Sequence, residues 1–377
     1  MIFLDNASTT QVSEECAAIV KDYMLNSYFN PSAPYHPSVE ISNQMNKWRE
    51  SILRVLNGDG KFIFTSSGTE SDNIALFGTK KPKCSKIIVS AAEHPAVYRC
   101  AEELKQRGYE VLYAEVDSGG RVIEDKFIQA IDDNTALVSI MHVNNETGAI
   151  NDIKNLCKLA KEKNNRIIFH SDGVQAVGKI KFSINDLGVD LYSVSSHKIH
   201  APKGCGGLFI RKGINLRPII YGGGQEYNVR SSTENIPCIA GFSYSLQKAI
   251  EKIDEHLIQA KNCNKILRDE LSKYSDQYRI ISNEDASPYI LSFALKFVRG
   301  EVMLHSLEKY GIYVGTGSAC SNNKSERNRH KFFNLPPEYE KGVIRVSLSH
   351  KTTVNEIYNF INYLNLEYSQ LVKYMKG

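Results

Sequence analysis

Between residues 60 and 212, short apolar runs alternate with longer stretches that have the amphipathic pattern of helices. Each run is continuously apolar and rich in β-branched and aromatic residues, and together the runs cover residues 62–64, 86–89, 111–113, 137–141, 167–169, 191–194 and 208–210. Such runs are typical of strands buried on both faces of a parallel sheet. The stretches between them predict helices at residues 70–79, 95–107, 124–132 and 152–164. We therefore expect an α/β fold with a mostly parallel, seven-stranded sheet.

The pattern changes after the three glycines at 222–224. Apolar residues at helical spacing predict one long helix over residues 239–273. Strands near 289–297, 312–314 and 343–348 and a final helix over 354–373 then predict a smaller α+β domain. We expect an N-terminal segment that packs with the small domain, a large domain and a small C-terminal domain, with the limits 1–15, 16–255 and 256–377.

Composition narrows the class of protein. With 377 residues, of which 42% are hydrophobic and 23% charged, the chain is long enough for a large and a small domain and is unlike a disordered one. No apolar run is long enough to cross a bilayer, and the N-terminus lacks the basic start of a secretion signal. A net charge of +4 does not require a polyanionic partner. We therefore expect neither membrane binding nor direct nucleic-acid binding.

The cysteines indicate a reducing compartment. They are Cys16, Cys84, Cys100, Cys157, Cys205, Cys238, Cys263 and Cys320. Because no two form a C-x-x-C pair, we predict neither a zinc ribbon nor a thioredoxin-like motif. We also assign no residue as a metal ligand. Without a secretion signal the expected location is the cytoplasm, where disulfides are rare. Any functional cysteine is then expected to act as a thiol.

Two nucleotide-binding motifs are excluded. Residues 173–179 match most of a P-loop, but Ile180 stands where a hydroxyl must meet magnesium, and Asp172 would lie beside the phosphates. The sequence also contains no G-x-G-x-x-G, so a dinucleotide-binding fold has no support.

Polar residues follow four of the predicted strands, at 66–70, 93–94, 144–145 and 171–172. In an open α/β sheet, ligands bind at the carboxyl ends of the strands, so these clusters are expected to converge. Gly68 and Thr69 begin a predicted helix, where backbone N–H groups and a hydroxyl would suit a phosphate. The alternative is an ordinary Ser/Thr cap with no ligand.

Lys198 follows the sixth predicted strand, in the sequence Ser195-Ser196-His197-Lys198. A lysine in this position could form a Schiff base with an aldehyde cofactor, and the alternative is a solvated surface lysine. Asp172 lies at another strand end and favours the cofactor, because a carboxylate there can keep a pyridine nitrogen protonated.

Taken together, these segments resemble the cysteine desulfurases of the NifS/IscS type, in the class V aminotransferase group of pyridoxal-phosphate enzymes of fold type I. The resemblance extends over nearly the whole chain and rests on residues 4–7, 30–32, 65–73, 93–97, 142–148, 170–179, 195–207, 222–226, 230–235, 315–321 and 344–348. It implies the fold of these enzymes, pyridoxal 5′-phosphate as cofactor and L-cysteine as substrate. It also implies a two-fold homodimer with active sites at the interface.

The resemblance assigns most of the cofactor site. It implies the Schiff base on Lys198 and a contact of Asp172 with the ring nitrogen. His94 would stack on one face of the ring and take part in catalysis, and Val174 would cover the other face. Further contacts are implied for Gly68, Thr69, Ser195 and His197 with the phosphate, for Ser196 with the cofactor, for Gln175 and Asn145 near the phenolic oxygen, and for Thr233 with the phosphate of the neighbouring subunit. Without the resemblance, His94 would be interpreted as a structural histidine.

The resemblance also assigns the reaction. Arg345 would bind the substrate carboxylate with help from Asn30 and Asn145. Lys198 would remove the Cα proton. Cys320 would then attack the substrate sulfur, leaving a persulfide on Cys320 and releasing alanine. Without the resemblance, Arg345 would be a strand-edge charge. Most cysteines are small inert hydrophobes, but the polar residues after Cys320 indicate an exposed position, where a nearby cation could lower the pKa of the thiol.

Residues 321–331 follow Cys320 and contain no apolar anchor, so we expect a mobile segment. Its basic residues either steer an acidic or tRNA-bound sulfur acceptor or are solvated charges without consequence; they are Lys324, Arg327, Arg329 and Lys331. The sequence does not choose among an iron–sulfur scaffold, a tRNA-thiolation enzyme and a cofactor-biosynthesis carrier as the acceptor.

Several positions depart from the usual family pattern: Ser67, Gly173, Ser196, His200-Ala201 and Thr316. None removes a reacting group, but they leave the substrate preference open. The alternatives are a selenocysteine lyase or another class V aminotransferase-like enzyme, which would not need Cys320. A non-catalytic scaffold of the same fold is a further alternative, against which the intact Lys198 argues.

Overall fold

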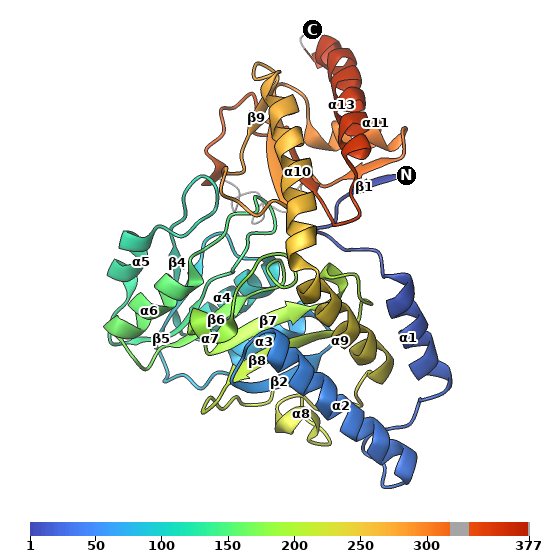
Figure 1. The fold of residues 1–377 in the computed structure, drawn as a ribbon. Helices are drawn as coiled ribbons and strands as arrows, with labels where there is room; N and C mark the ends of the chain where they lie inside the picture. The colour runs from blue at the N-terminus through green and yellow to red at the C-terminus, as the bar shows by residue number, and fades with distance from the viewer. Residues whose placement is uncertain (317–331, 376–377) are drawn as a thin grey trace.

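The computed structural model describes residues 1–316 and 332–375 (Figure 1). A seven-stranded sheet in the order β4-β3-β5-β6-β7-β8-β2 forms the large part of the molecule. Its strands are β2 (Gly60–Thr65), β3 (Lys86–Ser90), β4 (Glu110–Ala114), β5 (Thr135–Ser139), β6 (Ile168–Asp172), β7 (Leu191–Ser195) and β8 (Gly206–Arg211). The strands β4, β3, β5, β6 and β7 run parallel, and β8 is antiparallel to both of its neighbours. The prediction of a mostly parallel seven-stranded sheet is confirmed.

Helices cover both faces of this sheet. They are α1 (Glu14–Leu25), α2 (His36–Val55), α3 (Gly68–Gly78), α4 (Pro95–Gln106), α5 (Glu124–Ala130), α6 (Ile153–Lys163), α7 (Ile184–Leu187), α8 (Gln225–Asn228) and α9 (Ile236–Glu251). Ile52 of α2, Leu156 of α6 and Phe242 of α9 belong to the core on one face, and Leu76 of α3 and Leu104 of α4 to the core on the other. Burial on two faces is the reason that the strands read as continuous apolar runs. None of the helices within the described ranges has the length and apolar character needed to cross a membrane.

The smaller part has its own core and two small sheets. The strands β9 (Tyr278–Ile280), β10 (Ile290–Leu295) and β12 (Val343–Ser347) are antiparallel in the order β12-β10-β9, and β1 (Ile2–Leu4) pairs in parallel with β11 (Ile312–Val314). The helices α10 (Ile253–Ser272), α11 (Gly300–Glu308) and α13 (Val354–Met375) pack on these sheets. The N-terminal strand therefore lies beside C-terminal elements (Figure 1), and Leu4 is buried in their core. The domain limits 1–15, 16–255 and 256–377 stay a prediction.

The long helix predicted over residues 239–273 is two helices. α9 ends at Glu251 and α10 begins at Ile253, with Lys252 between them at φ −104° and ψ 15°. The buried side chains of α9 pack on the large sheet, whereas those of α10, such as Leu267, pack in the smaller core. The break lets each helix direct its apolar face to a different core. A single straight helix has one apolar stripe and would direct it to one side only. The sequence pattern also missed β9 and α11.

Candidate active site

A cavity of about 340 Å³ lies at the carboxyl ends of β6 and β7, beside the first turn of α3. It is lined by Ala7, Ser8, Ser67, Gly68, Thr69, Asp72, His94, Met141, Asn145, Asp172, Val174, Gln175, Ser195, His197, Lys198 and Arg345. The polar clusters that follow separate strands therefore do converge, as expected of an open α/β sheet.

One end of the cavity fits a phosphate group. Ser67 caps α3, its Oγ accepting a hydrogen bond from the Glu70 N–H at 3.1 Å, and Gly68 and Thr69 are the first two helical residues. A Cβ on Gly68 would lie 2.7 Å from Cγ2 of Val174, so only glycine allows this close approach. The buried hydroxyl of Ser195 has no hydrogen-bond partner among the described residues. A helix N-terminus and an unpaired donor are what a phosphate group of a cofactor requires.

Two buried carboxylates lie in the same cavity. Asp172 ends β6 and its Oδ1 accepts a hydrogen bond from the Val174 N–H at 2.9 Å, while burial raises its pKa to about 6. Burial, and then the charge of Asp172, raise the pKa of Asp72 well above its usual value, and Oδ1 of Asp72 has no hydrogen bond among the described residues. A protonated ring nitrogen placed at Asp172 would supply the positive charge that this pair lacks.

Lys198 enters the cavity from the end of the 3₁₀ turn η1 (Ser196–Lys198), which directly follows β7. Its Nζ donates hydrogen bonds to the carbonyl oxygens of Ala7 at 2.5 Å and Ser8 at 2.6 Å. Burial, followed by the charge of Arg345, lowers the pKa of Lys198 to about 8. A lysine with such a pKa is partly neutral near pH 7 and can therefore act as a nucleophile or a base.

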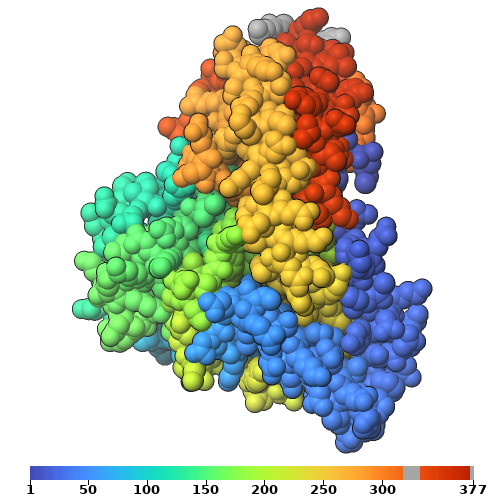
Figure 2. Space-filling view, in the orientation of Figure 1, coloured from blue at the N-terminus to red at the C-terminus, as the bar shows by residue number. Residues whose placement is uncertain are grey.

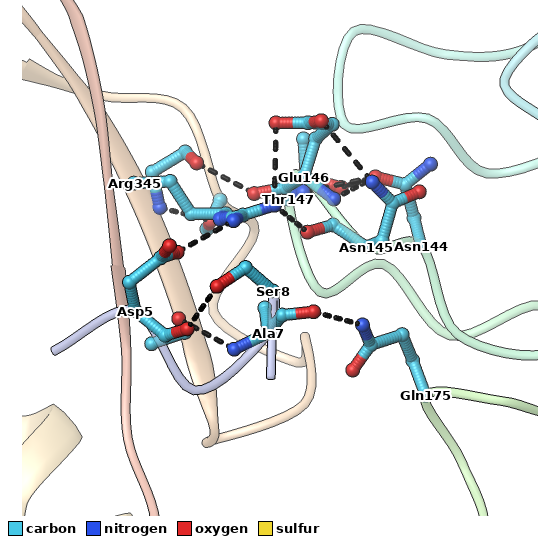
Figure 3. A network of polar contacts seen from close by, with 12 residues as sticks. Asp5, Ala7, Ser8, Asn144, Asn145, Glu146, Thr147, Gln175 and Arg345 are labelled. Atoms are coloured by element: carbon cyan, nitrogen blue, oxygen red, sulfur yellow. Dashed lines mark hydrogen bonds and ion pairs between the residues drawn. The ribbon is translucent and has the colours of Figure 1, made fainter. Parts of the chain in front are cut away.

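Arg345 on β12 brings the small part of the molecule to the cavity (Figure 3). Its Nη2 lies 2.7 Å from Oδ1 of Asp5, and its Nη1 donates to the carbonyl oxygen of Asn145 at 2.9 Å and lies 3.8 Å from Oε2 of Glu146. Nε is buried and has no partner in the described ranges. A Cβ on Gly315 would lie 3.0 Å from Nη2, so the facing glycine makes room for the guanidinium.

The remaining polar side chains of the cavity are tied to the backbone and to one another. His94 caps α4, and its Nδ1 accepts a hydrogen bond from the Ala96 N–H at 3.2 Å. Gln175 donates from Nε2 to the Ala7 carbonyl oxygen at 2.8 Å (Figure 3). The ring of His197 lies 3.2 Å from the hydroxyl of Thr9, and burial lowers the pKa of His197 to about 4, so the ring is neutral at pH 7.

Three of the predicted site residues lie among the described residues but do not line this cavity. Ser196 is buried, and its hydroxyl donates to the backbone oxygen of Cys205 at 2.7 Å, so in this subunit it stabilises the turn. Thr233 is exposed, and Asn30 is exposed with its Oδ1 accepting from the Ser32 N–H at 2.9 Å. Cys320, with the basic segment 321–331, lies outside the described residues.

The sequence pattern missed three charged side chains of this region. Asp5 is paired with Arg345, Asp72 lies in the first turns of α3, and Lys179 donates from Nζ to Oε1 of Gln175 at 2.6 Å. Burial lowers the pKa of Lys179 to about 7. The sequence did offer an indication for Asp72. It follows Gly68 by one helical turn and therefore lies on the same face of α3. No local pattern points to Asp5 or Lys179.

Comparisons with known proteins agree with this geometry. Residues 2–360 match the model of the family described as aminotransferase class-V. The chain is 37% identical over 362 residues to the cysteine desulfurase IscS of Dictyoglomus turgidum, covering 94% of this chain and 91% of that protein. It is also 37% identical over 366 residues to a cysteine desulfurase of Nostoc sp., covering 95% and 90%. A solved NifS-like protein superposes with a TM-score of 0.91 at 33% identity, covering 98% of this chain and 100% of that one. The chain belongs to the class-V aminotransferase family and, within it, to the cysteine desulfurases of the NifS/IscS type.

Proposed function

We propose that the protein is a pyridoxal-phosphate-dependent cysteine desulfurase, which converts L-cysteine to L-alanine and leaves a persulfide on Cys320. The observation that carries the proposal is that Lys198 and Asp172 line one cavity with a phosphate-type cradle at Gly68 and with Arg345. The 37% sequence identity to two named cysteine desulfurases, over 94% and 95% of this chain, supports the proposal.

The side chains of the cavity suit the removal of a proton from the substrate. Pyridoxal phosphate, when bound, supplies an electron sink for negative charge at the substrate Cα. Lys198, whose pKa burial lowers to about 8, accepts the Cα proton as a neutral amine. Asp172 would keep the ring nitrogen protonated, and His94, which lines the same cavity, would be a second group for proton transfer.

We assign the binding of the substrate carboxylate to Arg345. The planar guanidinium can bind a carboxylate through two parallel hydrogen bonds, and Nε, which has no partner among the described residues, is an available donor. Asn145 lines the cavity next to it, and Asn30 is proposed to assist from outside the cavity of this subunit.

Sulfur transfer needs a thiolate, and we assign it to Cys320. The thiolate forms an S–S bond with the substrate sulfur while the Cβ–S bond of the substrate breaks. The electron pair of that bond stays with Cβ, which takes up a proton and becomes the methyl group of alanine. The step is balanced without an external oxidant, because the two electrons that the sulfurs lose on forming the S–S bond are those that reduce Cβ to a methyl group.

The protein is proposed to act as a homodimer. Large apolar side chains are exposed on α1, on α2, on the loop between them and on the segment around α8; they are Met24, Leu25, Tyr28, Tyr35, Val39, Tyr221 and Tyr227. The helices α2 and α8 lie at the end of the molecule opposite the C-terminal helix (Figures 1 and 2). An exposed apolar surface of this kind marks an interface. Thr233, exposed and close in sequence to this surface, would then reach the phosphate of the partner subunit, and Ser196 would hold the turn that carries Lys198.

The sulfur is proposed to pass to an acceptor protein, an iron–sulfur scaffold or a tRNA-thiolation enzyme, in the cytoplasm. The decisive experiment incubates the protein with L-cysteine and measures sulfide and alanine, for the natural chain and for Cys320→Ala. We expect Cys320→Ala to lose sulfide production. Equal sulfide production by both proteins would contradict the desulfurase assignment. It would indicate a lyase, which breaks the Cβ–S bond without Cys320.

A further inference from the structure

A second cavity, of about 380 Å³, is lined by residues of α9, of α10 and of the N-terminal segment, among others. The N-terminal segment contributes Ala7 and Ser8 to the active-site cavity, and Thr10 and Ser13 to this one. Lys198 is the one described residue that lines both cavities. The second cavity is therefore a neighbour of the active site and has walls of its own.

Three histidines from three elements are in ring contact on the wall of this cavity. His200 follows η1, His256 lies in the first turns of α10, and His350 follows β12. The ring centroids of His200 and His350 are 4.5 Å apart, and those of His256 and His350 are 4.2 Å apart with nearly parallel planes. Burial lowers the pKa of His200 to about 4, and burial and then the charge of His200 lower the pKa of His350 to about 3. The rings of His200 and His350 are thus neutral at pH 7, and burial also lowers the pKa of His256.

The charged groups around the rings are mostly cationic. Lys252 and Lys351 line the cavity, and neither has a carboxylate within 4.0 Å among the described residues. Besides the three histidines, the titratable and charged side chains that line the cavity are Glu14, Glu15, Lys179, Lys198, Tyr244, Lys248, Lys252, Glu255, Tyr289 and Lys351. Positive charges that face a cavity and lack partners create a positive potential in it, which favours an anion.

Tyr289 gives an independent indication of a ligand. It lines the cavity and is 4% exposed, and its buried hydroxyl has no hydrogen-bond partner among the described residues. A buried hydroxyl without a partner costs free energy, so native proteins keep few of them, often at sites where a water or a ligand accepts the bond.

We propose that this cavity is a binding site for a small oxyanion, held by the imidazoles of His200, His256 and His350, the ammonium groups of Lys252 and Lys351, and the hydroxyl of Tyr289. An oxyanion among the three rings favours their protonated forms, because the imidazolium N–H groups donate charge-assisted hydrogen bonds to it. Binding therefore takes up protons and becomes tighter as the pH falls from 8 to 6. The site does not depend on the reaction proposed above.

The test is calorimetric titration of the full-length protein saturated with pyridoxal phosphate, so that the phosphate cradle at Gly68 is filled. Inorganic phosphate and citrate are separate probes, and sodium chloride at equal ionic strength controls for screening. Buffers of different ionisation enthalpy count the protons taken up. The variants are His350→Ala and the exposed-site change Lys252→Gln, and the matched control is His305→Ala on α11, whose side chain is 72% exposed.

We expect saturable binding of phosphate or citrate at pH 6, with proton uptake, that weakens at least tenfold in both His350→Ala and Lys252→Gln and is unchanged in His305→Ala. Which probe binds tells whether the site takes a tetrahedral phosphate or a carboxylate. Absence of saturable binding by either probe, or equal binding in Lys252→Gln and the natural chain, overturns the proposal. Lys252→Gln keeps the test valid if His350→Ala does not fold.

Discussion

Nη2 of Arg345 lies 2.7 Å from Oδ1 of Asp5, although the two residues are 340 positions apart in the chain. The contact connects the strand β12 to the turn that follows β1, and it places the carboxylate of Asp5 beside the guanidinium proposed to bind the substrate carboxylate. Asp5 thus orients Arg345 and, in the proposed function, competes with the substrate carboxylate for it.

Asp5→Asn is expected to lower the KM for L-cysteine. The amide oxygen can still accept the hydrogen bond from Nη2, so Arg345 stays in place, but the competing negative charge is gone. We expect a KM about threefold to tenfold lower, equivalent to about 1 kcal/mol, with little change in kcat. Arg345→Lys, which loses the planar fork, is the contrasting variant and should raise KM by roughly tenfold or more. Steady-state kinetics check both, and an unchanged KM in Asp5→Asn would mean that the pair does not face the substrate.

Lys198 is expected to be the lysine that attaches the cofactor. The purified protein should be yellow, and Lys198→Ala should lose alanine production entirely. Lys179 is the matched control, because it is also buried near the cavity and also has a lowered pKa. Borohydride reduction followed by peptide mass spectrometry should find the modification on Lys198 in the natural chain and in Lys179→Met. A modified Lys179 would show that the wrong lysine was assigned.

Cofactor uptake by the apoprotein is expected to depend on pH. The lysine must be neutral to attack an aldehyde, and burial lowers the pKa of Lys198 to about 8. The rate of uptake should therefore rise about tenfold per pH unit below pH 8 and level off above it. Stopped-flow absorbance between pH 6 and 10 checks the profile. A rate that keeps rising to pH 10 would indicate a lysine with an ordinary pKa.

Asp172 and Asp72 are expected to respond differently to the same change. Asp172→Asn removes the charge that holds the ring nitrogen protonated, so we expect kcat to fall by about a hundredfold or more while the cofactor remains bound. Burial and the charge of Asp172 raise the pKa of Asp72 well above its usual value, which favours its neutral form. The neutral amide of Asp72→Asn should therefore change kcat by only a small factor. Absorbance titration and kcat are the measurements. An equal loss of kcat in both variants would contradict the proposal that Asp172 is the carboxylate that keeps the ring nitrogen protonated.

His94 has a structural and a proposed catalytic role, which two substitutions separate. His94→Ala loses both the cap of α4 and the imidazole, and His94→Asn keeps a side chain that can cap the helix. Both should lower kcat on the order of a hundredfold, the usual contribution of a general acid or base. Only His94→Ala should also lose about 1 kcal/mol of stability in denaturant unfolding. Normal turnover in His94→Asn would leave His94 with the structural role alone.

Much of the fold could be predicted from the chain because its signals are local. The strands of the large sheet are buried on both faces, so each is a short, continuously apolar run, and all seven were found where the runs predicted them. The helices between them were found within a few residues of their predicted ends. The prediction of one helix over 239–273 was wrong, because the helix breaks at Lys252. The apolar residues keep helical spacing on both sides of the break, so the spacing does not show that the two segments pack on different cores.

The sequence by itself determined the chemical groups of the site. It places a lysine, a carboxylate and a helix start with glycine and hydroxyl groups at the ends of predicted strands. The tertiary structure alone decided which charges meet. Asp5 reaches Arg345 because β1 pairs with β11, and Asp72 reaches Asp172 because α3 packs against the carboxyl ends of β6 and β7. His200, His256 and His350 meet for the same reason. Charge interactions and pKa values depend on distance and burial in space, and these arise only when segments far apart in the chain pack together.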